Sequence, residues 1–149
     1  MNAALHTPIA LARRAIAAVE LLQPLAQLAA RLFVAQAFFL SGLTKLRDWD
    51  ITVALFTDEY HVPLLPPELA AVMGTGGELV LPVLLALGLA GRFAAAGLSV
   101  VNVVAVLSLA ELAPAALLQH QWWGSLLLAL LLWGPGRWSV DALLSRRLP

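Results

Sequence analysis

Four apolar stretches, each about twenty residues long, constrain the fold of this chain more than any other feature. They cover residues 25–46, 68–90, 93–113 and 119–138. A helix of about 20 apolar residues is long enough to cross the roughly 30 Å hydrocarbon core of a bilayer. Hydrophobic residues make up 61% of the 149 residues and charged residues only 12%, which is about half the charged share of a soluble domain. The sequence therefore predicts an all-α integral membrane protein, a four-transmembrane-helix bundle.

Prolines and glycines separate these stretches. Pro24, Pro66–Pro67 and Pro114 precede three of them, as expected from the preference of proline for the first turn of a helix. Gly91–Arg92 is the whole junction between the second and third stretches. We therefore expect those two helices to form an antiparallel hairpin.

Residues 8–23 carry a further helical pattern ahead of the first stretch. Apolar residues recur there at helical spacing, and Arg13–Arg14 can reach anionic headgroups. A charged pair before an apolar run also resembles a signal peptide. However, Glu20 and Gln23 interrupt the run, and no small-residue cleavage site follows. We predict an N-terminal interfacial helix that lies on the membrane surface.

Lysine and arginine are distributed unevenly between the two sides of the predicted bundle. Lys45 and Arg47 lie on one side, and six arginines lie on the other: Arg13, Arg14, Arg92, Arg137, Arg146 and Arg147. Short loops rich in lysine and arginine stay in the cytoplasm. Both termini are therefore predicted to be cytoplasmic, with the long loop of residues 47–67 outside.

The composition of this outer loop predicts an ordered segment. Asp48 is placed to cap a short helix that carries apolar side chains for contact with the bundle or the membrane. Prolines between residues 62 and 67 then enforce an extended backbone. We expect the loop to cover the outer end of the bundle.

Glu78 lies inside the second apolar stretch, where an ionisable side chain is costly unless it faces protein or water. Counting about 1.5 Å per residue predicts that it lies near the membrane centre, level with Gln36 and Asn102. Arg31 and Lys45 lie toward opposite surfaces, and each can reach part of the way. The predicted polar binding cluster is Arg31, Gln36, Ser41, Lys45, Glu78 and Asn102. Three interpretations remain open: interhelical contacts that fix helix register, a quinone or proton-linked site, and a substrate path.

Small residues precede the glutamate. Gly76–Gly77 and the following Pro82 predict a locally irregular helix around Glu78. The alternative is that these glycines allow close packing against the first helix at Ser41–Gly42. Glycine-rich faces of this kind also permit a homo-oligomer.

Other chemistries have little support in the sequence. The chain has no cysteine, which excludes disulfides and thiolate metal sites. His61 and His120 are weak metal-ligand candidates that lack a ligand spacing; His61 lies in the outer loop and His120 at the outer mouth of the fourth predicted span. No hydrolytic triad or phosphate-binding loop is recognisable, and the net charge of zero gives no sign of nucleic-acid binding. We therefore expect no enzyme that acts on its own.

Residues 27–142 resemble the DoxX family of small bacterial inner-membrane proteins. The resemblance depends on a set of short motifs: Arg31, Ser41–Gly42 with Lys45, Glu78–Leu79, Gly91–Arg92–Phe93, and Gly134–Pro135–Gly136 through Asp141. Residues 49–68 and 120–124 further resemble the DoxX proteins of proteobacterial operons associated with metal stress and copper-handling peptides.

The resemblance implies a four-helix inner-membrane protein that works with partners. Founding members resemble a small subunit of a quinone-linked thiosulfate oxidoreductase, and other relatives are membrane partners of redox proteins. The first hypothesis is therefore a non-autonomous membrane component of a quinone-linked redox or oxidative/metal-stress system, with quinone as its cofactor. The alternatives are a transporter of a small ligand or metal, and a non-catalytic scaffold that docks a periplasmic protein.

Overall fold

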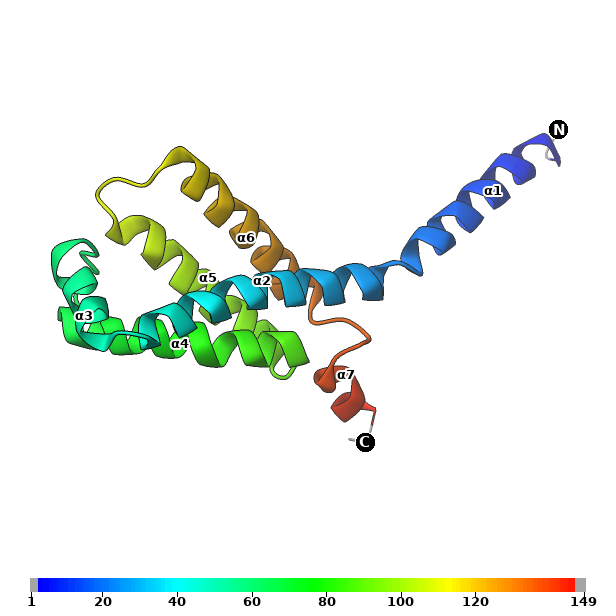
Figure 1. The fold of residues 1–149 in the computed structure, drawn as a ribbon. Coiled ribbons are helices and arrows are strands. Elements are labelled where there is room, and N and C mark those ends of the chain that lie inside the picture. Colours follow the sequence, from blue (N-terminus) through cyan, green and yellow to red (C-terminus); the bar gives the residue numbers. More distant parts are fainter. Residues whose placement is uncertain (1–2, 147–149) are drawn as a thin grey trace.

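The computed structural model describes residues 3–146, with side chains from Ala10 onward. The described residues form helices joined by short turns and loops, and no strand is found among them (Figure 1). The helices are α1 (Ala3–Glu20), α2 (Gln23–Leu46), α3 (Trp49–Asp58), α4 (Pro67–Leu87), α5 (Gly91–Ser108), α6 (Pro114–Trp133) and α7 (Val140–Ser145).

The helices α2, α4, α5 and α6 form the predicted bundle. In the described part of the chain, these four helices are the ones long and apolar enough to cross a membrane. The first of these spans is continuous with the end of α1. The most extensive contacts join α2 to α4, α4 to α5 and α5 to α6, and fewer contacts between α2 and α6 close the ring. The α4–α5 pair is the predicted antiparallel hairpin.

A dry apolar core holds the bundle together. Its buried side chains come from all four helices: Val34, Phe38, Leu85, Ala94, Ala95, Leu98, Leu127 and Leu130. Large apolar side chains such as Leu40, Val80, Val103 and Leu128 are instead exposed on the outside. An apolar surface of this extent is unfavourable in water and suits lipid. The protein is therefore a multi-pass membrane protein.

The ends of the helices follow local chemistry, and several differ from the predicted boundaries. Two helices end five residues early, α5 at Ser108 rather than at residue 113 and α6 at Trp133 rather than at residue 138. Gly88 adopts a left-handed conformation (φ 66°) and ends α4 at Leu87 rather than at residue 90. Pro114 stands in the first turn of α6, so this helix begins there and not at residue 119. A proline at this position lacks only an N–H that has no partner within the helix.

The predicted N-terminal helix is present but has different bounds. It runs from Ala3 to Glu20 and turns into α2 through Leu21 and Leu22. Figure 1 shows α1 projecting away from the bundle. Its contact with a membrane surface stays a prediction.

The bundle has two ends, which differ in the segments that cover them. At the loop end, α2 finishes, α3 packs on α4, and the chain continues through residues 59–66. Asp48 caps α3 as predicted, accepting a hydrogen bond from the amide of Ile51 at 3.0 Å. The His61 amide donates to the Ser108 carbonyl at 2.9 Å, which ties the loop to α5. At the terminal end lie the start of α2, the α4–α5 turn and the C-terminal segment, residues 134–146.

Candidate functional site

Glu78 is paired with Lys45. Among the described residues one ion pair is found, between Lys45 Nζ and Glu78 Oε2 at 2.5 Å. The same Nζ donates to Ser41 Oγ at 3.0 Å, one helical turn earlier on α2. The two charges cancel, which lowers the cost of placing either of them in a membrane. Three members of the predicted polar cluster are thus brought together.

A glycine allows the two helices to approach this closely. A Cβ added at Gly42 would lie 2.9 Å from Leu79 Cγ and 3.1 Å from Glu78 Cβ. The predicted irregularity of the second span is wrong, because α4 runs unbroken through Gly76, Gly77 and Pro82. Gly77 instead faces Val101 of α5. Close packing therefore explains Gly42 and Gly77 but not Gly76, where an added Cβ would meet nothing within 4 Å, and Gly77 packs on α5 rather than on the first helix as the alternative interpretation had it.

The prediction that Glu78 lies level with Gln36 is also wrong. Glu78 lies beside Gly42, nearly two turns along α2 from Gln36. The first turns of α4 extend to pack on α3, where Phe56, Ala70 and Ala71 form a second small core. Counting residues from the start of the helix therefore misplaces Glu78 along α2.

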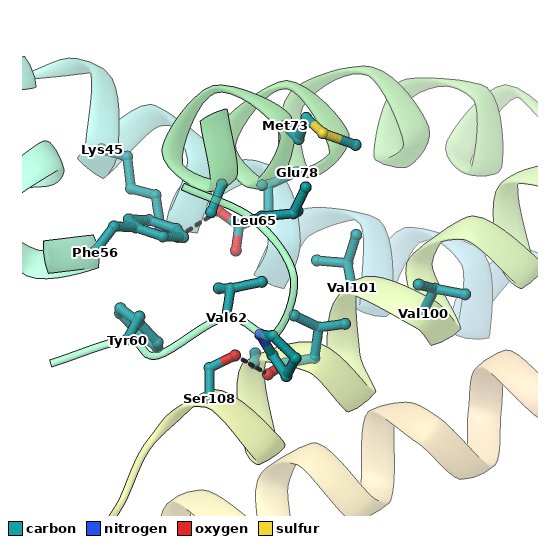
Figure 2. Close-up of a pocket in the computed structure, with 15 residues that line it drawn as sticks. Lys45, Phe56, Tyr60, Val62, Leu65, Met73, Glu78, Val100, Val101 and Ser108 are labelled. Atoms are coloured by element: carbon teal, nitrogen blue, oxygen red, sulfur yellow. Dashed lines mark hydrogen bonds and ion pairs between the residues drawn. The ribbon is translucent and has the colours of Figure 1, made fainter. Parts of the chain in front are cut away.

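An apolar cavity of about 330 Å³ adjoins the ion pair (Figure 2). Lys45 and Glu78 line it, and most of the other lining residues are apolar: Phe56, Tyr60, Val62, Pro63, Leu65, Ala70, Met73, Gly74, Val100, Val101, Val104, Ala105 and Ser108. Pockets that bind small ligands have this composition, with a few polar groups in a mainly apolar wall and volumes of about 300–1,000 Å³. The cavity is therefore the candidate functional site.

The cavity reaches the surface that faces lipid. Met73 of α4 and Val100 of α5 line it, and both side chains are more than half exposed on the outside of the bundle. On the side toward the loop end, Tyr60, Val62 and Leu65 form its wall (Figure 2). A ligand dissolved in the bilayer thus has a lateral approach between α4 and α5.

Two hydroxyl groups add to the polar character of this site. Ser108 Oγ donates to the Val104 carbonyl at 2.6 Å, which leaves its oxygen free to accept. Tyr60 stacks on Phe56 with ring centroids 5.1 Å apart. Burial raises the pKa of Tyr60, and the carboxylates of Glu78 and Glu59 raise it further. Neither Tyr60 nor Ser108 was predicted as a site residue. Tyr60 lies in the outer loop, and Ser108 lies inside the third predicted span, where a hydroxyl that bonds a carbonyl of its own helix gives no signal in the sequence.

Arg31 is separated from this site, contrary to the predicted cluster. It is 1% exposed, at the terminal end of α2, and Nη2 donates to the carbonyl of Trp138 at 2.5 Å. Its Nε and Nη1 atoms have no hydrogen-bond partner among the described residues. Gly88 packs so closely that an added Cβ would overlap Arg31 Nη1 and Ser139 Cβ. Arg31 thus joins α2 to the C-terminal segment and the α4–α5 turn.

Asp141 completes the terminal end and was not predicted as a site residue. Its two carboxylate oxygens accept hydrogen bonds from the amides of Ala90 and Gly91, each at 2.8 Å. A carboxylate is favourable at a helix N-terminus because the first amides have no partner within the helix. Asp141 belongs to the closing motif of the sequence, but only the fold brings it to the start of α5.

Asn102 belongs to a third group of contacts, with His120. Asn102 Nδ2 donates to the His120 carbonyl at 3.0 Å, and Asn102 Oδ1 lies 2.8 Å from His120 Nδ1. Because Oδ1 only accepts, the ring nitrogen Nδ1 carries the proton. His120 was expected at the outer mouth of the fourth span. It lies further inside the helix, because α6 begins at Pro114.

The histidines do not assemble a metal site in the described residues. His61 contacts the Glu59 carbonyl through Nδ1 at 3.1 Å, and His120 is engaged by Asn102. No group of three or more His, Cys, Asp or Glu side chains between residues 10 and 146 is arranged to hold a metal ion. Each histidine has a structural partner instead.

Gln36 has no part in the predicted cluster, because its side chain is exposed on the outside of the bundle, where it lines an open groove between α2 and α4. It is exposed to the membrane side of α2, between the buried residues Val34 and Phe38. Depth along a helix does not set the direction of a side chain, and at about 100° per residue Gln36 faces away from both neighbours. The apolar core separates Arg31 from the Lys45–Glu78 pair. The six predicted residues therefore form three separate groups and one exposed side chain.

Comparison with known proteins gives one match. A family model described as DoxX matches residues 26–111, more than half of the chain. No curated protein matches the chain, and no solved structure does.

Proposed function

The chain belongs to the DoxX family, and from this premise we propose that it is a membrane component of a redox system that binds a membrane-soluble quinone beside Glu78. The observation that carries the proposal is the apolar cavity with the Lys45–Glu78 pair in its wall and lipid-facing side chains at its edge. A quinone combines an apolar ring, two carbonyl oxygens and an apolar tail. The ring matches the apolar wall of the cavity, the carbonyl oxygens match the ion pair, and the tail matches the lateral opening.

The polar groups suit both redox forms of a quinone. Lys45 Nζ uses two of its three protons on Ser41 and Glu78, so one proton remains to donate to a quinone carbonyl. Glu78 Oε1 accepts no hydrogen bond from the described residues and can accept from a quinol hydroxyl. In this proposal Lys45 orients the oxidised ring and Glu78 the reduced one.

The apolar residues determine how the rest of the ligand is held. Phe56, Val101 and Val104 provide surfaces for the ring. The isoprenoid tail leaves between Met73 and Val100 and lies along the outside of α4 and α5. Reduction of the quinone takes two electrons and two protons. The electrons come from a redox protein that docks at the loop end and the protons from water at the same surface, which makes this chain a non-autonomous component.

The separation of the polar groups supports ligand binding over transport. A transport path needs polar groups or water along the whole membrane thickness. Packed apolar side chains such as Val34, Leu98 and Leu127 instead occupy the bundle between Arg31 and Glu78. We therefore rank a transporter below a quinone-binding component.

We also propose that the protein lies in the bacterial inner membrane with both termini in the cytoplasm. Support comes from the arginines at the terminal end, which include Arg92 and Arg137, and from the acidic residues at the loop end, such as Asp58 and Glu59. In this orientation the cavity lies in the outer leaflet, near the periplasmic surface.

Photoaffinity labelling tests the proposal directly. The purified protein in nanodiscs is illuminated with a photoreactive short-chain quinone, and the labelled peptides are identified by mass spectrometry. Labels are expected on α4 and α5 around Met73 and Val100, and excess unlabelled quinone should remove them. Labelling that is scattered over all lipid-facing helices, or that does not compete, would overturn the proposal.

A further inference from the structure

A second cavity lies at the terminal end, opposite the quinone cavity. It is a groove of about 820 Å³ between the start of α2, the start of α5, the end of α6 and the C-terminal segment. Gln27, Arg92, Arg137 and Ser139 are among its lining residues. The wall is thus far more polar than that of the Lys45–Glu78 cavity, and its two arginines are both exposed.

The two arginines have no ion-pair partner within the described protein, although two acids share the wall of the groove. No ion pair joins Arg92 or Arg137 to a carboxylate between residues 10 and 146. Asp141 also lines the groove, but both of its oxygens are engaged by the amides of α5. Glu20, at the end of α1, is the one other acid in the wall. The groove therefore presents two unpaired guanidinium groups.

Donor groups remain available on both sides of the groove. Arg92 uses Nη2 for the Leu132 carbonyl at 3.3 Å, and its other N–H groups are unengaged within residues 10–146. Gln27 makes only a long contact, 3.5 Å from Nε2 to the Gly134 carbonyl. Guanidinium and amide donors converging on one space are the chemistry that binds a phosphate.

The surroundings place the groove at the depth of lipid headgroups. Trp133, the last residue of α6, lines the groove, and Trp138 lies in the C-terminal segment that forms one of its walls. The side chains of these tryptophans are 75% and 57% exposed. Tryptophan is enriched where the hydrocarbon meets the headgroups. Leu25 and Leu132 are exposed nearby on α2 and α6, where acyl chains would lie.

We propose that this groove binds the phosphate of an anionic phospholipid, held by Arg92 and Arg137 while the acyl chains lie against α2 and α6. A phospholipid is favoured over a soluble phosphate because the groove adjoins both the tryptophans and the apolar lipid surface. The site is independent of the quinone cavity, since it shares no lining residue with it.

Native mass spectrometry of the full chain in detergent measures this binding. The probes are phosphatidylglycerol and phosphatidylcholine with identical acyl chains. Phosphatidylglycerol is expected to bind more tightly. The double variant Arg92→Gln/Arg137→Gln should weaken that binding about thirtyfold, given the contribution of each arginine near an anionic surface, and should leave phosphatidylcholine binding unchanged.

The matched control changes the same number of arginines elsewhere at the terminal end. Arg13 and Arg14 are exposed on α1 and do not line the groove. The variant Arg13→Gln/Arg14→Gln should keep most of the phosphatidylglycerol affinity, whereas an equal loss in both double variants would overturn the proposed site. A circular dichroism melt checks that Arg92→Gln/Arg137→Gln is folded, and Arg92→Lys/Arg137→Lys should recover part of the binding.

Soluble glycerol phosphate distinguishes the two sources of the phosphate group. We expect it to displace phosphatidylglycerol only weakly, because it has no acyl chains. Displacement at comparable concentrations would show that the groove takes a free phosphate ester, and equal affinities for the two phospholipids would overturn the proposed preference for an anionic headgroup.

Discussion

Arg31 and Lys45 are cations of the same helix, α2, yet their surroundings differ in every respect that matters. Arg31 is almost fully enclosed, bonds a backbone carbonyl and packs on Gly88. Lys45 has a carboxylate partner and borders a cavity that reaches the lipid. A buried charge in a membrane helix therefore does not indicate a functional site by itself. The adjoining space decides whether the charge can meet a ligand.

The partners of the two cations explain the difference. Arg31 donates to the carbonyl of Trp138, and Asp141 accepts from the amides of Ala90 and Gly91. These are backbone groups that need a partner when they are buried, so both side chains stabilise the fold. Arg31 also has two nitrogens without partners among the described residues, but protein encloses them. The unpartnered proton and oxygen of the Lys45–Glu78 pair instead border the cavity. We expect substitutions around Arg31 and Asp141 to lower the stability of the protein, and substitutions around Lys45 and Glu78 to weaken quinone binding.

Gly88→Ala should break the terminal end most severely. The added methyl group overlaps Arg31 and Ser139, and the φ of 66° disfavours alanine. We expect a loss of about 3 kcal/mol or more in the free energy of unfolding, measured by reversible unfolding in mixed detergent micelles. Gly76→Ala is the control, because a Cβ there meets nothing within 4 Å. A similar effect of both substitutions would contradict the packing of Arg31.

Asp141→Asn should cost about 2 kcal/mol of unfolding free energy. Asparagine offers one acceptor oxygen in place of two and carries no charge for the N-terminus of α5. Asp50→Asn provides the comparison, because Asp50 is an exposed acid in the first turn of α3, where about 0.5 kcal/mol is expected. If the two losses are equal, Asp141 does not stabilise the terminal end in the way described.

Ser41→Ala should have a smaller effect, at the loop end. It removes the oxygen that accepts from Lys45, and we expect a loss of about 1 kcal/mol in the unfolding free energy. Thr44→Val is the matched control, since Thr44 bonds only the Leu40 carbonyl of its own helix. The same unfolding assay compares them, and an effect of Ser41→Ala no greater than that of Thr44→Val would argue against a positioning role.

The smallest expected effect is a change in the titration of Tyr60, which is the single tyrosine of the chain. Its pKa is raised by burial and then by Glu78 and Glu59. Stability linked to Tyr60 is therefore complete below its ordinary pKa of about 10 and is lost as the pH rises through the raised value. Glu78→Gln should lower the pKa of Tyr60 while leaving it above the ordinary value, because burial is the larger cause.

Phenolate absorbance measures this titration without interference from a second tyrosine. Glu68→Gln is the control, since Glu68 is an exposed residue at the start of the same helix, α4. An unchanged Tyr60 titration in Glu78→Gln would show that the Glu78 carboxylate does not act on the wall of the cavity.

The fold could be predicted from the sequence largely because membrane spans depend on length and apolarity. The boundaries were less secure, since a proline can either separate two helices or open the next one. Pro114 opens α6, and His120 consequently lies further inside the helix than the predicted start at residue 119 implied. The cap by Asp48 was predictable because it involves only neighbouring residues.

The site could be predicted only in part. Ser41 and Lys45 lie one turn apart on α2, so their proximity was implied by the sequence. Their contact with Glu78 depends on how far α4 extends past the end of α2. The packing of α3 on the first turns of α4 sets that distance, and the sequence does not show this packing. Asp141 reaches the start of α5 through the turns at Gly134 and Gly136. No local pattern reports contacts of this kind.

Quinone affinity in paired variants tests the difference between the two ends most directly. A short-chain quinone is titrated into folded wild type, Glu78→Gln and Asp141→Asn in nanodiscs, and Trp fluorescence quenching reports binding. We predict that Glu78→Gln weakens binding at least about tenfold. Asp141→Asn should stay within about twofold of wild type, because its site is distant. Equal affinities in all three proteins, or a loss confined to Asp141→Asn, would contradict the assignment of ligand binding to the Lys45–Glu78 cavity.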